Sequence, residues 1–147
     1  MRKTIRAEAT IAASASELFA ALADYECAEM FIEGLERLSP VTSQTTGKDA
    51  EFEAVLKVGV QTLETRIVIE LYEPDRAITW SSAGQDGQNL SFQLEPIQDG
   101  TAVTLQVSYQ EPGGLAGALL APFVERTVQH RADTALERLR DHLSPRD

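Results

Sequence analysis

The sequence predicts an α+β fold, in which a curved antiparallel sheet of about seven strands surrounds one long C-terminal helix. Several stretches alternate apolar and polar residues with the period of two that half-buried strands show, and turn residues separate them. The one long stretch with helical periodicity comes last, over residues 122–143. Because this helix follows the strands, it has to lie across the sheet, and an apolar cavity can remain between the two layers. The 147 residues are expected to form a single domain, residues 1–147.

The first strand is predicted over residues 4–12, and two short helices follow it. Ser14 and Glu17 form a capping box, with Ser14 at the N-cap and Glu17 reaching back from the third helical position. Leu18, Phe19 and Leu22 then share one helix face. A second helical segment covers residues 26–32, and Gly34 ends it.

Six more strands are predicted after the helical pair. Their ranges are 35–43, 51–58, 63–72, 77–82, 90–94 and 103–109. In the 63–72 strand, parity places Leu63, Ile67 and Leu71 on the buried side. Asp99-Gly100 indicates a hairpin with a type I′ turn.

The last helix is predicted to begin near Pro122, because proline suits the first helical turn. Residues 113–121 would then form a loop or a short separate helix. One face of the helix carries the apolar residues Val124, Val128, Ala132, Ala135, Leu139 and Leu143, and the other carries Arg126, His130, Asp133, Glu137 and Arg140.

Composition excludes several classes of function. The net charge of -10, from 23 acidic and 13 basic residues, opposes binding to nucleic acid or to an anionic bilayer. Cys27 is the single cysteine, and with two histidines it is too little for an ordinary zinc site, so no metal or cofactor is expected. No apolar run has the length of a membrane span, and no signal-peptide pattern follows Met1, so the protein is expected in the cytoplasm.

Three phrases of the sequence resemble a known superfamily. Residues 15–25 are similar to its first-helix entry, 72–80 to its mid-sheet turn and strand, and 99–104 to the hairpin that opens its last strand. The chain thus resembles the START-like or SRPBCC superfamily, which has the helix-grip fold, and within it the polyketide cyclase/dehydrase and coenzyme Q-binding groups. This resemblance implies an apolar cavity for ligands such as lipids, quinones or polyketides, and it does not imply an enzyme.

Strand parity selects the residues expected to face such a cavity. Most are apolar, Thr65, Ser82 and Tyr109 supply hydroxyls, and Val128 and Arg131 come from the helix. The predicted ligand-binding set is Phe52, Leu56, Thr65, Ile67, Ile69, Trp80, Ser82, Phe92, Leu105, Tyr109, Val128 and Arg131. For any one of the strand residues, an ordinary packed core is the alternative.

No catalytic residues are predicted. The strand carboxylates Glu51, Glu53, Glu64 and Glu70 lie on the outward parity, so they cannot form an acid and base pair in the cavity. Arg131 is the one charged residue at the edge of the buried helix face. It can reach an enolate, carboxylate or phosphate there, or extend its head group to the rim.

The preferred function is binding, transport or sequestration of a hydrophobic small molecule in this cavity. One alternative is a polyketide aromatase or cyclase assisted by Arg131, Tyr109, Ser82 and Thr65. The other is a protein-interaction or toxin-type module with a filled cavity. The apolar segment 113–123, with Leu119 and Phe123 off the core face, can close a portal, touch a membrane, support a homodimer or fold over the sheet edge.

Overall fold

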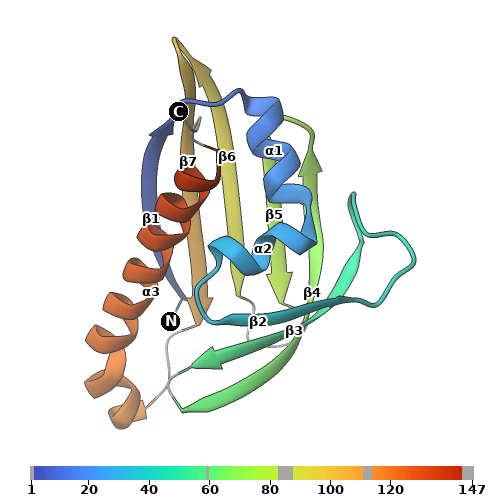
Figure 1. Cartoon of the computed structure of the whole chain (residues 1–147). Coiled ribbons are helices and arrows are strands. Elements are labelled where there is room, and N and C mark those ends of the chain that lie inside the picture. Colours follow the sequence, from blue (N-terminus) through green and yellow to red (C-terminus); the bar gives the residue numbers. More distant parts are fainter. Residues whose placement is uncertain (1, 59, 83–87, 111–113, 144–147) are drawn as a thin grey trace.

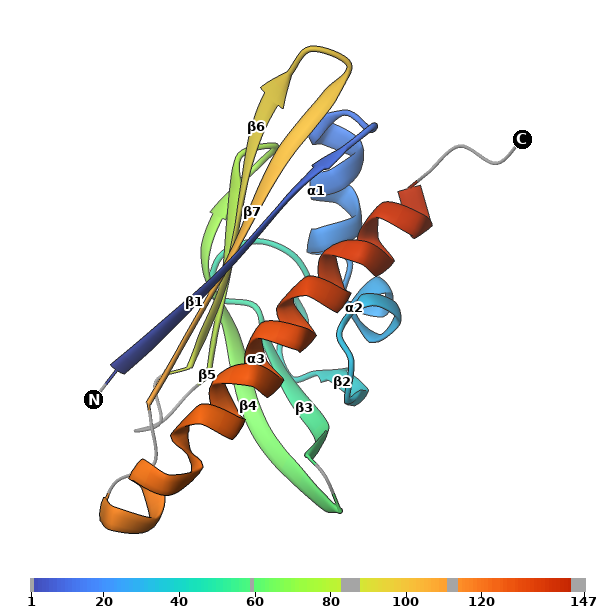
Figure 2. The same ribbon diagram turned by 90° about the vertical axis from the view of Figure 1, so that its left-hand side faces the viewer.

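One antiparallel sheet wraps around one long helix, as the sequence predicts (Figure 1). The computed structural model describes residues 2–58, 60–82, 88–110 and 114–143. The elements in chain order are β1 (Arg2–Ile11), α1 (Ala15–Ala23), α2 (Tyr25–Phe31), β2 (Leu35–Pro40), β3 (Glu51–Val58), β4 (Gln61–Glu73), β5 (Ala77–Ser82), β6 (Asn89–Ile97), β7 (Gly100–Gln110) and α3 (Gly114–Leu143). The seven strands lie in the order β1-β7-β6-β5-β4-β3-β2. Figure 2 shows all three helices on the same side of the sheet.

Local capping residues define the two short helices. The Ser14 hydroxyl accepts a hydrogen bond from the Glu17 amide at 3.1 Å, which confirms the predicted N-cap of α1. Asp24 ends α1 and caps α2, because its carboxylate accepts from the Glu26 amide at 3.0 Å. After α2, Gly34 adopts a φ of 88°, a left-handed conformation that favours glycine. The chain can therefore reverse direction between α2 and β2.

A β-bulge in β4 corrects the predicted parity of that strand. Ile69 pairs with Trp80 and Leu71 pairs with Thr79, so Glu70 is an extra residue in the ladder. Beyond the bulge the faces exchange. Leu71, predicted to be buried, is 39% exposed, while the ring of Tyr72 packs against Phe19 with its centroid at 5.0 Å. Leu63, also predicted to be buried, lies before the bulge and is 48% exposed.

The hairpin between β6 and β7 also differs from the prediction. Ile97 pairs with Gly100, so the loop residues are Gln98 and Asp99. Asp99 has a φ of 66°, and Gly100 is not among the residues with positive φ, whereas a type I′ turn with Asp99-Gly100 at its centre needs both. Gly100 is instead needed for space, because a Cβ there would lie 2.4 Å from the carbonyl oxygen of Ile11.

The helix α3 begins at Gly114, eight residues before the predicted start, and Pro122 lies inside it. The preceding segment is rich in alanine and leucine, whose helical propensity extends the helix through the proline. Ala132, Ala135 and Leu139 are buried as predicted, and so is Leu136. The predicted outer residues Arg126, His130, Asp133, Glu137 and Arg140 are exposed.

Side chains from the helices satisfy backbone groups at both edges of the sheet. On β1, the carbonyl of Arg6 accepts from Gln129 at 3.2 Å and that of Thr10 accepts from Arg140 at 3.1 Å. On β2, the amide of Leu38 donates to the Glu29 carboxylate at 3.1 Å. These contacts leave less free backbone for pairing with another chain. Within the described residues, no helix is long and apolar enough to cross a membrane.

Candidate functional site

The interface between the sheet and α3 contains a partly open pocket of about 250 Å³. Strands β3 to β7 form its floor, α3 forms one wall, and α1, α2, the α2–β2 loop and β2 form another. The lining is mainly apolar. Nine of the twelve residues predicted to bind a ligand line it: Leu56, Thr65, Ile67, Trp80, Ser82, Phe92, Leu105, Val128 and Arg131.

The other three residues of that set, Phe52, Ile69 and Tyr109, are not part of the lining. Phe52 is fully buried and its ring centroid lies 5.4 Å from that of Tyr25 and 5.4 Å from that of Trp80. Ile69 is also fully buried, and Tyr109 is nearly so. These side chains belong to the packed interior, because parity selects the inner face of a strand but not the part of that face where a void remains.

Sequence reasoning did not place the wall of the pocket that α1, α2 and β2 form. Its residues are Leu22 in α1, Ala28 and Phe31 in α2, Ile32 and Glu33 in the α2–β2 loop, and Leu35 and Leu38 in β2. Helical periodicity predicts that Leu22 is buried. It does not predict that Leu22 lines the pocket, because that position depends on how α1 and α2 pack against the sheet. Gln88 and Asn89 line the pocket near Ser82 and were likewise not predicted.

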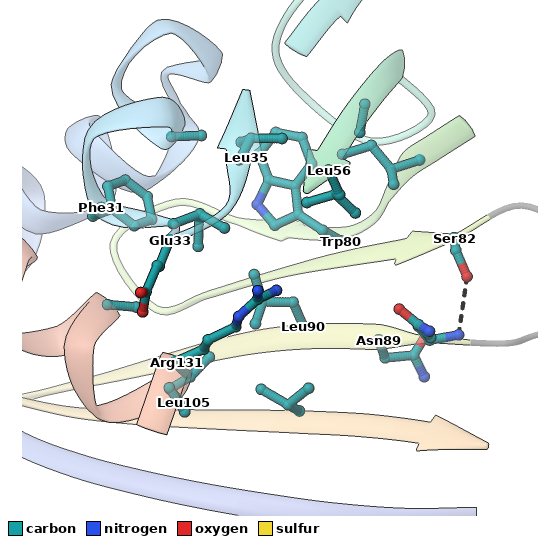
Figure 3. A pocket seen from close by; sticks show the side chains of 18 of the residues that line it. Phe31, Glu33, Leu35, Leu56, Trp80, Ser82, Asn89, Leu90, Leu105 and Arg131 are labelled. Carbon is teal, nitrogen blue, oxygen red and sulfur yellow. Dashed lines mark hydrogen bonds between the residues drawn. The ribbon is translucent and has the colours of Figure 1, made fainter. Parts of the chain in front are cut away.

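Arg131 points from α3 into this apolar space, toward Leu90 and Trp80 (Figure 3). One guanidinium nitrogen donates a hydrogen bond to the carbonyl of Lys57 at 3.2 Å. The same group packs against Gly34, where an added Cβ would lie 3.2 Å from the guanidinium and 2.9 Å from the Lys57 carbonyl oxygen. The position of Arg131 therefore depends on a glycine in the α2–β2 loop and on the end of β3.

Among the described residues that line the pocket, Glu33 is the one acidic residue. Its carboxylate points toward α3 in Figure 3, and its Oε2 lies 3.8 Å from the His130 Nε2. That oxygen is shielded from solvent and has no hydrogen-bond partner among the described residues. His130, on the outer face of α3, thus meets the loop that carries the carboxylate.

Ser82 and its neighbours form a second polar part of the lining. The Ser82 hydroxyl accepts from the amide of Gln88 at 2.9 Å, and the Ser82 amide donates to the Gln88 carbonyl at 2.8 Å (Figure 3). Leu35, Leu56, Trp80 and Leu90 lie between this pair and Glu33 in the view of Figure 3. A ligand in the pocket would therefore meet polar groups in two places separated by apolar surface.

The titratable groups of the strands do not converge on the pocket. Glu53, Glu64 and Glu70 are exposed and lie outside the lining, as parity predicts, and Arg66 pairs with Glu53 at 3.6 Å. Burial raises the pKa of the Cys27 thiol, and the hydrogen bond to Asp24 and the nearby acidic charges add to this effect. Cys27 also lies outside the lining. The described lining offers an arginine, a glutamate, hydroxyls and amides as its chemical groups.

Residues 2–144 of the chain match the sequence family described as polyketide cyclase/dehydrase and lipid transport. No curated protein matches the chain significantly in sequence.

Solved structures with a similar fold come from several bacteria. One is a protein from Thermus thermophilus with 20% identity and a TM-score of 0.81, the alignment covering 95% of each chain. Another is the Zhui aromatase/cyclase from Streptomyces sp. R1128, with 14% identity and a TM-score of 0.79, covering 97% of this chain and 93% of that one. The Aha1 dimer from Colwellia psychrerythraea is 16% identical with a TM-score of 0.65, covering 96% of both. At these identities the similarity establishes the helix-grip fold.

Proposed function

The chain belongs to the polyketide cyclase/dehydrase and lipid transport family, and from this membership we propose that its pocket binds a hydrophobic small molecule reversibly. The observation that carries the proposal is the apolar pocket between the sheet and α3. Its volume of about 250 Å³ lies just below the range for small-molecule sites, about 300 to 1,000 Å³. The expected ligand is therefore compact, and the driving force is the burial of its apolar surface at about 25 cal/mol per Å².

Trp80 makes the proposal testable, because it lines the pocket and is the single tryptophan of the chain. Titration with menadione, decanoic acid and an aromatic polyketide should change its fluorescence with saturation. Native mass spectrometry of protein purified gently from its own host should show an extra mass that disappears on denaturation. If the native and the denatured spectra both show only the mass of the ligand-free protein, and none of the three compounds changes the fluorescence, the proposal is wrong.

A pair of matched substitutions separates pocket binding from surface binding. Ala132 lines the pocket and is 3% exposed, whereas Ala20 is exposed on α1. Ala132→Leu should weaken binding about tenfold, a loss of about 1.4 kcal/mol, because the larger side chain occupies pocket volume and removes apolar contacts of the ligand. Ala20→Leu should leave binding unchanged. Equal effects of the two variants would show that the compounds bind elsewhere.

The second candidate is a polyketide aromatase or cyclase, which the polar groups of the pocket and the fold of the Zhui aromatase/cyclase support. Arg131 would stabilise an enolate by charge-assisted hydrogen bonds, and Ser82 and Thr65 would orient the chain. Tyr109 lies outside the lining and has no part in this version. With a poly-β-ketone substrate, Arg131→Ala should lower turnover, and unchanged turnover would remove the one cationic group from the scheme.

A further inference from the structure

Arg131 is a cation in an apolar wall with fewer partners than its chemistry requires. A guanidinium carries several N–H donors, and here the Lys57 carbonyl is its one hydrogen-bond acceptor among the described residues. The chain has 23 acidic residues, yet within the described part of the protein none lies within 4.0 Å of Arg131 in an ion pair. Arg131 is half-buried, so its charge is partly withdrawn from water, and such a charge without a counter-ion is less favourable than a paired one. An anionic group on a ligand would satisfy it.

The surroundings of Arg131 hold the guanidinium in place before any ligand arrives. Gly34 presents a backbone without a side chain to one part of the group, and the Lys57 carbonyl fixes one nitrogen at 3.2 Å. The backbone at this point is itself tied together, since the Lys57 amide donates to the Gly34 carbonyl at 2.7 Å. A preorganised donor loses less entropy when it binds its partner. Donors not used by Lys57 remain for a ligand.

Glu33 restricts which anion is acceptable. Its carboxylate lines the same pocket, is directed toward His130 at 3.8 Å, and forms no ion pair with Arg131. One arginine can balance one negative charge, and a second negative charge would meet the field of Glu33. A carboxylate carries a single charge on two oxygens that match the planar guanidinium, whereas a phosphate monoester carries more charge at neutral pH.

We infer that Arg131 binds the carboxylate of an otherwise apolar ligand, so that the pocket selects carboxylic acids over alcohols of the same length. This inference rests on the proposed binding function and adds the chemical class of the ligand. The apolar residues around Arg131, such as Leu90 and Trp80, would contact the hydrocarbon part.

Isothermal titration calorimetry at neutral pH with decanoate, 1-decanol and decyl phosphate tests this inference. Decanoate should bind at least about tenfold more tightly than 1-decanol, the size of effect expected for hydrogen bonds to a charged group. Decyl phosphate should bind more weakly than decanoate. Arg131→Met should abolish the preference for decanoate over 1-decanol, and far-UV circular dichroism with urea denaturation checks that the variant is folded. Arg126→Met, an exposed arginine on the same helix, should keep the preference.

The possible results distinguish the binding function of the pocket from the role of Arg131 in binding a carboxylate. Equal affinities for decanoate and 1-decanol, or a preference that survives Arg131→Met, would overturn the role of Arg131 while leaving the binding function intact. Tighter binding of decyl phosphate than of decanoate would overturn the choice of a carboxylate. Failure of all three amphiphiles to bind, with menadione or the aromatic polyketide still changing the Trp80 fluorescence, would overturn the inference and leave the binding function intact.

Discussion

Single residues with constrained backbones or environments control the geometry beside the pocket. Gly34 and Gly47 have nearly the same left-handed φ, 88° and 87°, but different neighbours. A Cβ at position 34 would meet a backbone carbonyl at 2.9 Å and the Arg131 guanidinium, whereas one at position 47 would meet the flexible end of Gln44 at 3.1 Å. The two glycines therefore form a natural comparison.

Gly34→Ala should destabilise the protein more than Gly47→Ala. Both variants incur the cost of a left-handed alanine, about 1–3 kcal/mol, and only Gly34→Ala adds a clash with backbone. Urea denaturation measures the free energy of unfolding of each variant. Gly34→Ala should also weaken ligand binding, because Arg131 would be displaced. A smaller loss of stability at position 34 than at position 47 would contradict this account.

Cys27 provides a prediction that depends on pH. Burial and the Asp24 side chain raise the pKa of its thiol, so the neutral form is favoured in the folded protein. Its contribution to stability is therefore complete below the ordinary thiol pKa and is lost as the pH rises through the folded value. At pH 8 iodoacetamide should label Cys27 more slowly in the folded chain than in urea. Asp24→Asn removes the charge while an amide oxygen can still cap α2, and it should speed the labelling of the folded chain.

Elements in this protein begin and end where side chains satisfy free backbone groups. The Ser14 hydroxyl accepts from the third residue beyond it, Glu17, while Ser16 is exposed inside α1 and its hydroxyl has no hydrogen-bond partner among the described residues. Ser14→Ala should cost about 1 kcal/mol of unfolding free energy, the usual value of an N-cap. Ser16→Ala should be neutral or slightly stabilising, because alanine is the better helix former. Thermal and urea unfolding of the two variants measure the difference, and equal effects would show that the cap does not stabilise α1.

The predicted bounds of the helices and strands were accurate for some elements and wrong for others. The ranges of β3 and β5 were predicted as observed, since uninterrupted alternation and flanking turns define them. The early start of α3 and the bulge at Glu70 were missed. A proline inside a helix and an extra residue in a ladder are tolerated only because the surrounding structure offsets their cost, and local pattern contains no information on that.

At the scale of the whole molecule, the interior consists of a packed part and a void. Phe52 occupies the packed part between Tyr25 and Trp80, and Leu56, further along the same strand face, lines the pocket. Period-two alternation treats the two positions alike. Their difference arises from the curvature of the sheet and from how closely α3 approaches each part of it.

Phe52→Ala should therefore lower the free energy of unfolding by about 3–5 kcal/mol, the usual cost of removing a buried phenylalanine. Phe123, which is 65% exposed on α3, serves as the control, and Phe123→Ala should change stability by less than about 0.5 kcal/mol. Urea denaturation with far-UV circular dichroism measures both. A large loss for Phe123→Ala would indicate that this side chain is covered in solution, for example by a second copy of the chain.

The sequence by itself determined the number of strands, the place of the long helix, the capping of α1 and the inner and outer faces of most elements, because periodicity and capping are local properties. Tertiary structure alone decided which inward residues line a pocket, and that Arg131 meets Gly34 and Lys57 while Glu33 meets His130. These contacts join segments far apart in the chain. They depend on the curvature of the sheet and the position of α3, which no local pattern specifies.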